Sequence, residues 1–378
     1  MEKRYLFAPG PTPVPPEVLA ATAEPIVHHR GPDFRVIYER TLARLKDVFR
    51  TEGDVLLFTA SGTGAMESAP ANLCAPGDRV AVVVHGAFGE RWVKICATHE
   101  LDVVPIRYEW GEFPDPAEVG AAVREAGAQV VFCQQSDTST GVVADVRGIK
   151  EAIGDVTLVV DAISSLGAVP LETDAWNIDV VVSGSQKALM SPPGLAMVSV
   201  PERLWPKVRT SRSFYFDWQG TKKAQEVFDA SFTPAVSLIK GLDVALGLLL
   251  DQGLDAAFER HIRLGRAARA GVKAMGLELF SPDADIAAVV TAVRVPEGVD
   301  GNKLLLDLRD RHGVTLAPGQ GDLKGKIFRI GHIGWFDIFD IAAALAAVEL
   351  SLTELGADIE RGVAVARAFE AYEERVTA

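Results

Sequence analysis

Short apolar runs alternate with helix-like segments from residue 17 to about residue 200. Near-continuous runs of Val, Ile and Leu are typical of strands that are buried on both faces of a sheet. Because helical segments separate these runs, the pattern predicts an α/β fold with a mostly parallel sheet flanked by helices. The runs are residues 55–58, 80–84, 103–106, 129–133, 158–160, 180–182 and 195–200.

The pattern changes after residue 230. Apolar positions recur at helical spacing over about 234–275 and again over about 338–372. Two strand-like runs, residues 287–295 and 326–330, lie between these helical stretches. This second pattern predicts a smaller α/β unit at the C-terminal end of the chain.

The length of 378 residues exceeds what a single core normally organises, so we predict two domains. We expect an N-terminal arm over residues 1–16, a large domain over residues 17–255 and a small C-terminal domain over residues 256–378. The prolines within residues 8–16 remove hydrogen-bond donors and disfavour a helix, so the arm is expected to be extended. The apolar residues 5–7 indicate that it docks.

Composition and charge narrow the class of protein. Apolar residues make up 48% of the chain and the formal net charge is −13, which argues against nucleic acid and anionic membranes as partners. Three cysteines, Cys74, Cys96 and Cys133, form no metal motif and are expected to be buried structural thiols. We expect a cytoplasmic protein without a signal peptide, a membrane span or a metal site.

Candidate chemistry is sought after each strand, because ligands of open α/β sheets bind at the carboxyl ends of the strands. Ser61, Gly62 and Thr63 follow the first run and open a helix. Backbone N–H groups and hydroxyls at such a helix start can hold a phosphate. An ordinary helix cap on a tight turn explains the same residues equally well.

Two charged residues follow buried strands further along the chain. Asp161 comes directly after residues 158–160, where a carboxylate is costly unless a cation such as a protonated pyridine nitrogen meets it. The alternative for Asp161 is a helix N-cap. Lys187 follows residues 180–182 among small and apolar residues, where desolvation would make its amine a nucleophile. The alternative for Lys187 is a side chain that reaches solvent.

Together these features match the requirements of pyridoxal phosphate (PLP). That cofactor needs a lysine for a Schiff base, an acid for its pyridine nitrogen and a helix N-terminus for its phosphate. An aromatic residue that stacks on the ring would complete the site. Phe88, after the run 80–84, is the candidate, with core packing as the alternative.

On these motifs the chain resembles the class V aminotransferases of PLP fold type I. Within them it is similar to the alanine/serine–glyoxylate/pyruvate group. The resemblance extends from residue 8 to residue 334, and several ordered motifs are far more specific than any one of them. The motifs are Ser61–Glu67, Asp137–Gly141, Val160–Gly167 and Ser183–Leu189.

The resemblance implies a role for each matching residue. Lys187 and Asp161 would be the catalytic residues, and Arg329 would bind the substrate carboxylate, for which its planar guanidinium is suited. Thr233 would reach the phosphate of a second subunit, which implies a homodimer with its active site at the interface. The cofactor-binding set would be Ser61, Gly62, Thr63, Phe88, Thr138, Asp161, Ser185, Gln186, Lys187 and Thr233.

The implied activity is ping-pong transamination between a small amino acid, alanine or serine, and a 2-oxo acid such as glyoxylate or pyruvate. A 2-aminoethylphosphonate–pyruvate transaminase, a phosphoserine transaminase and an aspartate- or ureidoglycine-type transaminase stay open as alternatives. A cysteine desulfurase is rejected because all three cysteines precede residue 134. A non-catalytic partner subunit that retains the fold is the alternative from another class. The role of residues 28–30, His-His-Arg, is left open.

Overall fold

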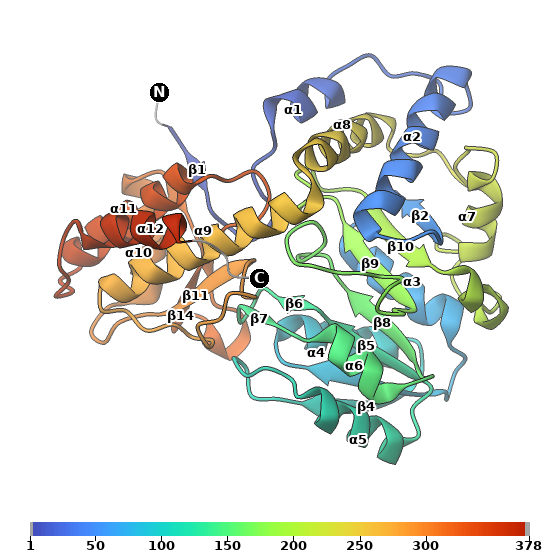
Figure 1. Ribbon diagram of the computed structural model, residues 1–378, viewed down its shortest axis with the longest axis horizontal. Helices are drawn as coiled ribbons and strands as arrows, with labels where there is room; N and C mark the ends of the chain where they lie inside the picture. The colour runs from blue at the N-terminus through green and yellow to red at the C-terminus, as the bar shows by residue number, and fades with distance from the viewer. Residues whose placement is uncertain (1–2, 375–378) are drawn as a thin grey trace.

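The predicted apolar runs form one seven-stranded sheet in the computed structural model, which describes residues 3–374 (Figure 1). Its strand order is β2-β10-β9-β8-β5-β3-β4. Only β10 runs antiparallel to its neighbours within this sheet, so the predicted mostly parallel sheet is confirmed. The strands are β2 (Asp54–Phe58), β3 (Arg79–Val84), β4 (Asp102–Arg107), β5 (Val130–Gln134), β8 (Thr157–Asp161), β9 (Val180–Gly184) and β10 (Ala196–Val200).

Helices cover both faces of this sheet, which explains why its strands read as unbroken apolar runs. Successive strand residues point to opposite faces, so Leu57 joins one hydrophobic cluster and Leu56 the other. The first cluster includes α2 (Pro32–Phe49), α5 (Pro116–Ala126), α6 (Val146–Ile153) and α8 (Val236–Gln252). The second includes α3 (Gly62–Leu73), α4 (Ala87–Thr98) and α7 (Trp218–Gln225). The three cysteines are buried in these clusters, as expected.

The C-terminal region forms a separate hydrophobic cluster around a three-stranded antiparallel sheet of order β11-β14-β13. In Figure 1, the long helix α9 runs from the end of α8 to this region. Within residues 3–374, no helix is both long and apolar enough to cross a membrane. The elements are α9 (Leu254–Ala274), β11 (Val290–Arg294), α10 (Gly301–Arg311), β12 (Val314–Thr315), β13 (Ala317–Pro318), β14 (Ile327–Gly331), α11 (Ile338–Glu354) and α12 (Val363–Glu373).

Both long helical stretches that were expected here are interrupted. The stretch over 234–275 is two helices, because Gly253 adopts a φ of 85° that ends α8 before α9 begins. The stretch over 338–372 is likewise two helices, because α11 ends at Glu354, shortly before Gly356 with a φ of 88°, and α12 begins only at Val363. The domain boundary near residue 255 coincides with the start of α9 and stays a prediction.

The N-terminal arm docks on the C-terminal region. Strand β1 (Tyr5–Leu6) pairs in parallel with β12, and Phe7 is buried against Phe336 with the two ring centres 5.7 Å apart. Figure 1 shows β1 beside the C-terminal helices, although these helices are distant from β1 in the sequence. The apolar residues before the prolines therefore anchor the arm, and the prolines lead it to the carboxyl end of the large sheet.

Candidate active site

The predicted catalytic residues lie at one edge of the large sheet. Asp161 is the last residue of β8, and Lys187 follows the end of the neighbouring strand β9 by three residues. Because β8 and β9 are parallel and paired, their carboxyl ends meet at the same edge. The sheet thus brings a carboxylate and an amine together from separate parts of the sequence.

Lys187 is buried, and its side chain does not reach solvent as the alternative required. Its Nζ donates a hydrogen bond to the Pro9 carbonyl oxygen at 2.6 Å. A Cβ on Gly10 would lie 2.4 Å from Lys187 Nζ, and the φ of +143° at Gly10 favours glycine, so this residue suits the close approach of the arm to the lysine. Burial, and then the positive charge of Arg329, lower the pKa of Lys187 to about 8. The amine is therefore a stronger candidate nucleophile than an ordinary lysine.

Asp161 is buried and does not cap a helix. The Ile163 backbone N–H donates to Asp161 Oδ1 at 2.8 Å, and the following residues form turns. Burial raises the pKa of Asp161 to about 7, although the hydrogen bond from Ile163 acts in the opposite direction. A carboxylate in this position gains from a cation that arrives with a ligand.

The start of α3 has the features of an anion site. Ser61 is exposed at the N-cap position, and its hydroxyl makes no capping hydrogen bond. The ordinary capping role is therefore not what this serine does. Gly62 packs so closely on the Asp161 turn that a Cβ would lie 2.6 Å from Ile163 Cδ1. Nearby, the buried Gln186 Oε1 has no hydrogen-bond partner among the described residues.

Arg91 is a charged residue of this site that the sequence analysis missed. Its Nη1 donates to Thr63 Oγ1 at 3.1 Å, and its guanidinium lies 4.6 Å from the centre of the Phe88 ring. The positive charge of Arg91 also lowers the pKa of Asp161 and of Lys187. Because Arg91 follows Phe88 by three residues, helical spacing already placed the two side chains on one face of α4.

A short hairpin of β6 (Ser136–Asp137) and β7 (Val142–Val143) lies beside Phe88. Asp137 is buried, and its Oδ2 accepts from the Phe88 backbone N–H at 2.9 Å. The Ser139 backbone N–H donates to Asp137 Oδ1 at 3.0 Å. Asp137 therefore fixes the start of α4 and the adjoining Thr138 loop. Asp137 lies in one of the sequence motifs, but the sequence alone indicates no role for it.

Arg329 reaches this hairpin from the C-terminal region. It lies on β14, is buried, and donates from Nε and Nη2 to the Pro318 carbonyl oxygen at 2.9 and 2.7 Å. Its Nη1 donates to the Thr138 carbonyl oxygen. Burial lowers the pKa of Arg329 to about 10, which still leaves it positively charged at neutral pH. The structure thus places a cation next to the Thr138 loop.

Comparison with known families decides the identity of the fold. The family model described as aminotransferase class-V matches residues 4–322. This chain belongs to the class-V aminotransferases. That family is one of transferase enzymes, and its members are generally PLP-dependent.

Individual relatives match this class-V chain over almost its full length. It is 40% identical to an uncharacterized aminotransferase of Methanocaldococcus jannaschii, over 97% of each chain. It is 40% identical to a soluble hydrogenase small subunit of Synechococcus, over 94% of each chain. A serine–glyoxylate aminotransferase of Methylorubrum extorquens is 35% identical, over 97% of this chain and 95% of its own.

Solved structures agree with the fold of this class-V chain. The ureidoglycine–glyoxylate aminotransferase of Bacillus subtilis superposes with a TM-score of 0.93 and 30% identity, over 99% of each chain. The predicted PLP fold type I is therefore confirmed.

Two predicted cofactor residues of this class-V chain, Ser185 and Thr233, do not point to a cofactor role by their contacts within the chain. Ser185 is buried, and its hydroxyl donates to the Pro192 carbonyl oxygen at 2.6 Å, which fixes the turn after β9. Thr233 is exposed in the loop before α8, beside Phe232 and Tyr215. An exposed position is what a residue needs if it serves a second subunit. Both cofactor roles stay predictions.

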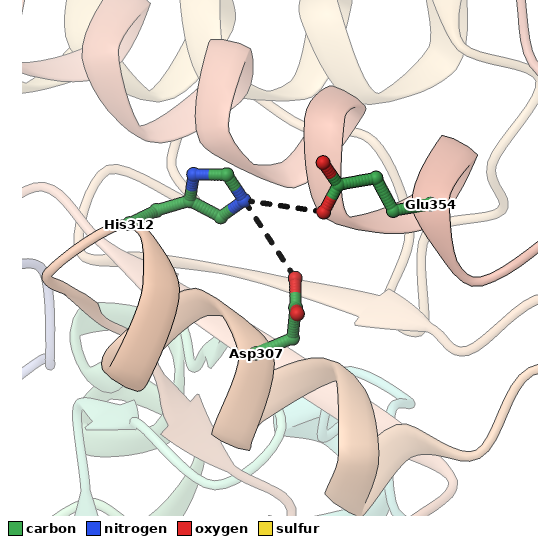
Figure 2. Close-up of side chains that lie close together, drawn as sticks. All are labelled: Asp307, His312 and Glu354. Atoms are coloured by element: carbon green, nitrogen blue, oxygen red, sulfur yellow. Dashed lines mark ion pairs between the residues drawn. The ribbon is translucent and has the colours of Figure 1, made fainter.

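A separate cluster in the C-terminal region contains side chains that could ligate a metal (Figure 2). His312 Nε2 lies 3.6 Å from Asp307 Oδ2 and 3.7 Å from Glu354 Oε2. However, Arg311 Nη1 donates to Asp307 Oδ1 at 3.1 Å and also pairs with Glu354. A positive charge of the protein thus already bridges the two carboxylates, so the cluster is explained as an ion-pair network between α10 and α11.

Proposed function

We propose that this chain is a PLP-dependent transaminase. It would move an amino group from alanine or serine to a 2-oxo acid such as glyoxylate or pyruvate. The observation that carries the proposal is the pair at adjacent strand ends: a buried lysine with a lowered pKa and a buried carboxylate. A fold without catalysis has no need to bury both groups, because each costs free energy when it is buried while charged.

The described residues fit PLP. The N–H groups at the start of α3, with the hydroxyls of Ser61 and Thr63, would hold the phosphate. Phe88 would stack on the ring, and Asp161 would pair with the ring nitrogen. The buried Gln186 Oε1, which has no partner within the described residues, offers an acceptor beside Gly62 and Gly184. Thr138 would lie at the ring oxygen or the substrate.

The bound cofactor would supply an electron sink for the bond that breaks at the amino acid α-carbon. Lys187 Nζ would take the α-proton and deliver it again on the cofactor side. Asp161 would hold the ring nitrogen protonated, and Arg329 would bind the substrate carboxylate through its guanidinium. The enzyme would keep the amino group after the first product leaves and before the acceptor binds. The kinetics would therefore be ping-pong.

The proposal extends to the assembly and to the substrates. We infer a cytoplasmic homodimer in which Thr233 completes the phosphate site of the other subunit, with a large domain over residues 17–255 and a small one over residues 256–378. The serine–glyoxylate and ureidoglycine–glyoxylate names of the relatives support glyoxylate as acceptor. A 2-aminoethylphosphonate, aspartate or ureidoglycine donor is the alternative within the same chemistry.

The test is a visible absorbance spectrum of the purified protein with PLP, recorded before and after each candidate donor. L-Serine, L-alanine, L-aspartate and 2-aminoethylphosphonate are added separately. We expect a cofactor band that alanine or serine bleaches. A band bleached by another donor would reassign the substrate. Absence of any band would contradict the enzyme function. It would favour a non-catalytic partner subunit, a role suggested by the name of one relative, a soluble hydrogenase small subunit.

The lowered pKa of Lys187 predicts how fast cofactor-free protein captures PLP at each pH. Only the neutral amine attacks, so the rate should rise with pH through a midpoint of about 8, well below the 10.5 of an ordinary lysine. Because the charge of Arg329 contributes to this lowering, Arg329→Gln should move the midpoint upward. The exposed Arg147→Gln serves as the control and should leave it in place. A wild-type midpoint near 10.5 would contradict the prediction.

A further inference from the structure

The segment that follows Arg329 connects the N-terminal arm with the backbone of Lys187. The Gly331 N–H donates to the Phe7 carbonyl oxygen at 2.6 Å. Three residues later, Gly334 has a φ of +90°, and a Cβ there would lie 3.1 Å from the Lys187 carbonyl oxygen. Both glycines lie in the segment Arg329–Gly334, with which the resemblance to the family ends, and the proposed function uses only the arginine of this segment.

Two consecutive residues of α9 hold Gly334 by both of its backbone polar groups. His261 Nε2 accepts from the Gly334 N–H at 2.9 Å. Arg260 Nη1 donates to the Gly334 carbonyl oxygen at 2.8 Å and to the Phe336 carbonyl oxygen at 3.1 Å. Since both side chains project from one helix, the helix fixes the position of this peptide segment.

The hydrogen bonds of His261 define its protonation state. His261 is fully buried, and its Nδ1 lies 2.7 Å from the Ala257 carbonyl oxygen, which can only accept. Nδ1 therefore carries the proton, and Nε2 presents a lone pair to Gly334. Burial, followed by the charge of Arg260, holds the pKa of His261 well below its usual value, so the ring stays neutral.

Gly334 rests on the part of the chain that carries the reactive amine. The Lys187 carbonyl oxygen accepts from Thr12 Oγ1 at 2.9 Å, and the Thr12 hydroxyl is itself 3.1 Å from a Cβ built on Gly334. The Lys187 side chain, in turn, bonds to Pro9 of the same arm. A displacement of Gly334 would therefore move Thr12 and Lys187 together, and it would also act on Arg329 five residues earlier.

We propose that His261 and Arg260 are positioning residues that set the Lys187 amine relative to the Arg329 guanidinium. They act from α9 through the Gly331–Phe336 segment and touch neither substrate nor cofactor. The inference rests on the proposed function, in which Lys187 moves a proton of the substrate whose carboxylate Arg329 binds. The distance between the amine and the guanidinium then affects the rate. A misplacement of about 1 Å at a reacting group is enough to slow a reaction about 100-fold.

The test compares His261→Leu with His261→Gln in the PLP-loaded protein. Leucine removes the acceptor for Gly334, whereas the glutamine oxygen can replace Nε2. We expect His261→Leu to lower kcat with the donor that bleaches the wild type by about 10- to 100-fold. It should also shift the pH midpoint of the cofactor absorbance. His261→Gln should behave like the wild type in both measurements.

Leu345→Ala is the matched control, because it leaves a cavity in the core of the C-terminal region at a residue that none of these hydrogen bonds involves. It should lower the melting temperature without moving kcat or the absorbance midpoint. The proposal is overturned if His261→Leu affects stability alone, if His261→Gln is equally impaired, or if Leu345→Ala gives the same shifts. Should His261→Leu not fold, Arg260→Met takes its place, and wild-type kinetics there would overturn the proposal. A wild-type protein without a cofactor band would instead defeat the proposed function itself.

Discussion

Replacing Lys187 with alanine is expected to abolish turnover. The proposed chemistry needs this amine twice, to hold the cofactor and to move the α-proton, and among residues 3–374 no other lysine closely follows β8 or β9. Loss of a positioned base alone costs about 10²- to 10⁴-fold in rate, and loss of the covalent step adds to this. Steady-state assays with serine or alanine and glyoxylate would measure the effect. Full activity in Lys187→Ala would refute the assignment.

A second buried lysine provides the control for this variant. Lys240 is 7% exposed and pairs with Glu24 and the Pro25 carbonyl oxygen, and it has no part in the proposed chemistry. Lys240→Ala should destabilise the protein but leave kcat nearly unchanged. Addition of a small primary amine to Lys187→Ala should restore part of the proton transfer, which a misfolded protein would not allow.

Asp161→Asn is expected to reduce the rate far more than it reduces cofactor affinity. Asparagine keeps the shape and can still accept a hydrogen bond, but it carries no charge to keep a ring nitrogen protonated. Removal of one preorganised electrostatic partner typically costs about 10²- to 10³-fold in kcat. The dissociation constant for PLP, measured by absorbance titration, should change by much less, because the phosphate and Lys187 contacts remain.

The buried Asp243 supplies the comparison for Asp161. It is 3% exposed and pairs with Arg40 and Arg44, outside the site. Asp243→Asn should lower stability and leave the rate per folded molecule intact. Equal losses of rate and of PLP affinity in Asp161→Asn would show that the carboxylate only shapes the pocket.

The large sheet could be predicted from the sequence because its signal is local. Both faces of the sheet are covered, so each strand is a short run of apolar residues. Such a run can be recognised without knowing which strands lie next to it. The ends of the helices were harder to predict. The break at Gly253 depends on a left-handed backbone conformation that glycine permits but does not require.

For the site, the sequence identified the residues that follow strands. Asp161 and Lys187 were found because a charge after a buried strand is unusual in any context. Arg91 was missed because an arginine on an amphipathic helix is ordinary until its neighbours Thr63 and Phe88 are known. His261 gave no signal, since a single histidine within a helix reads as a core or surface residue.

The sequence by itself therefore determined the fold class, the order of the strands along the chain and the segments that carry the chemistry. Only the tertiary structure decided which distant segments meet: Pro9 and Gly10 against Lys187, and Arg329 against the Thr138 loop. The physical reason is the range of the interactions. Burial patterns and turn propensities act within a few residues, whereas these contacts form only when the arm and the C-terminal region pack against the carboxyl end of the large sheet.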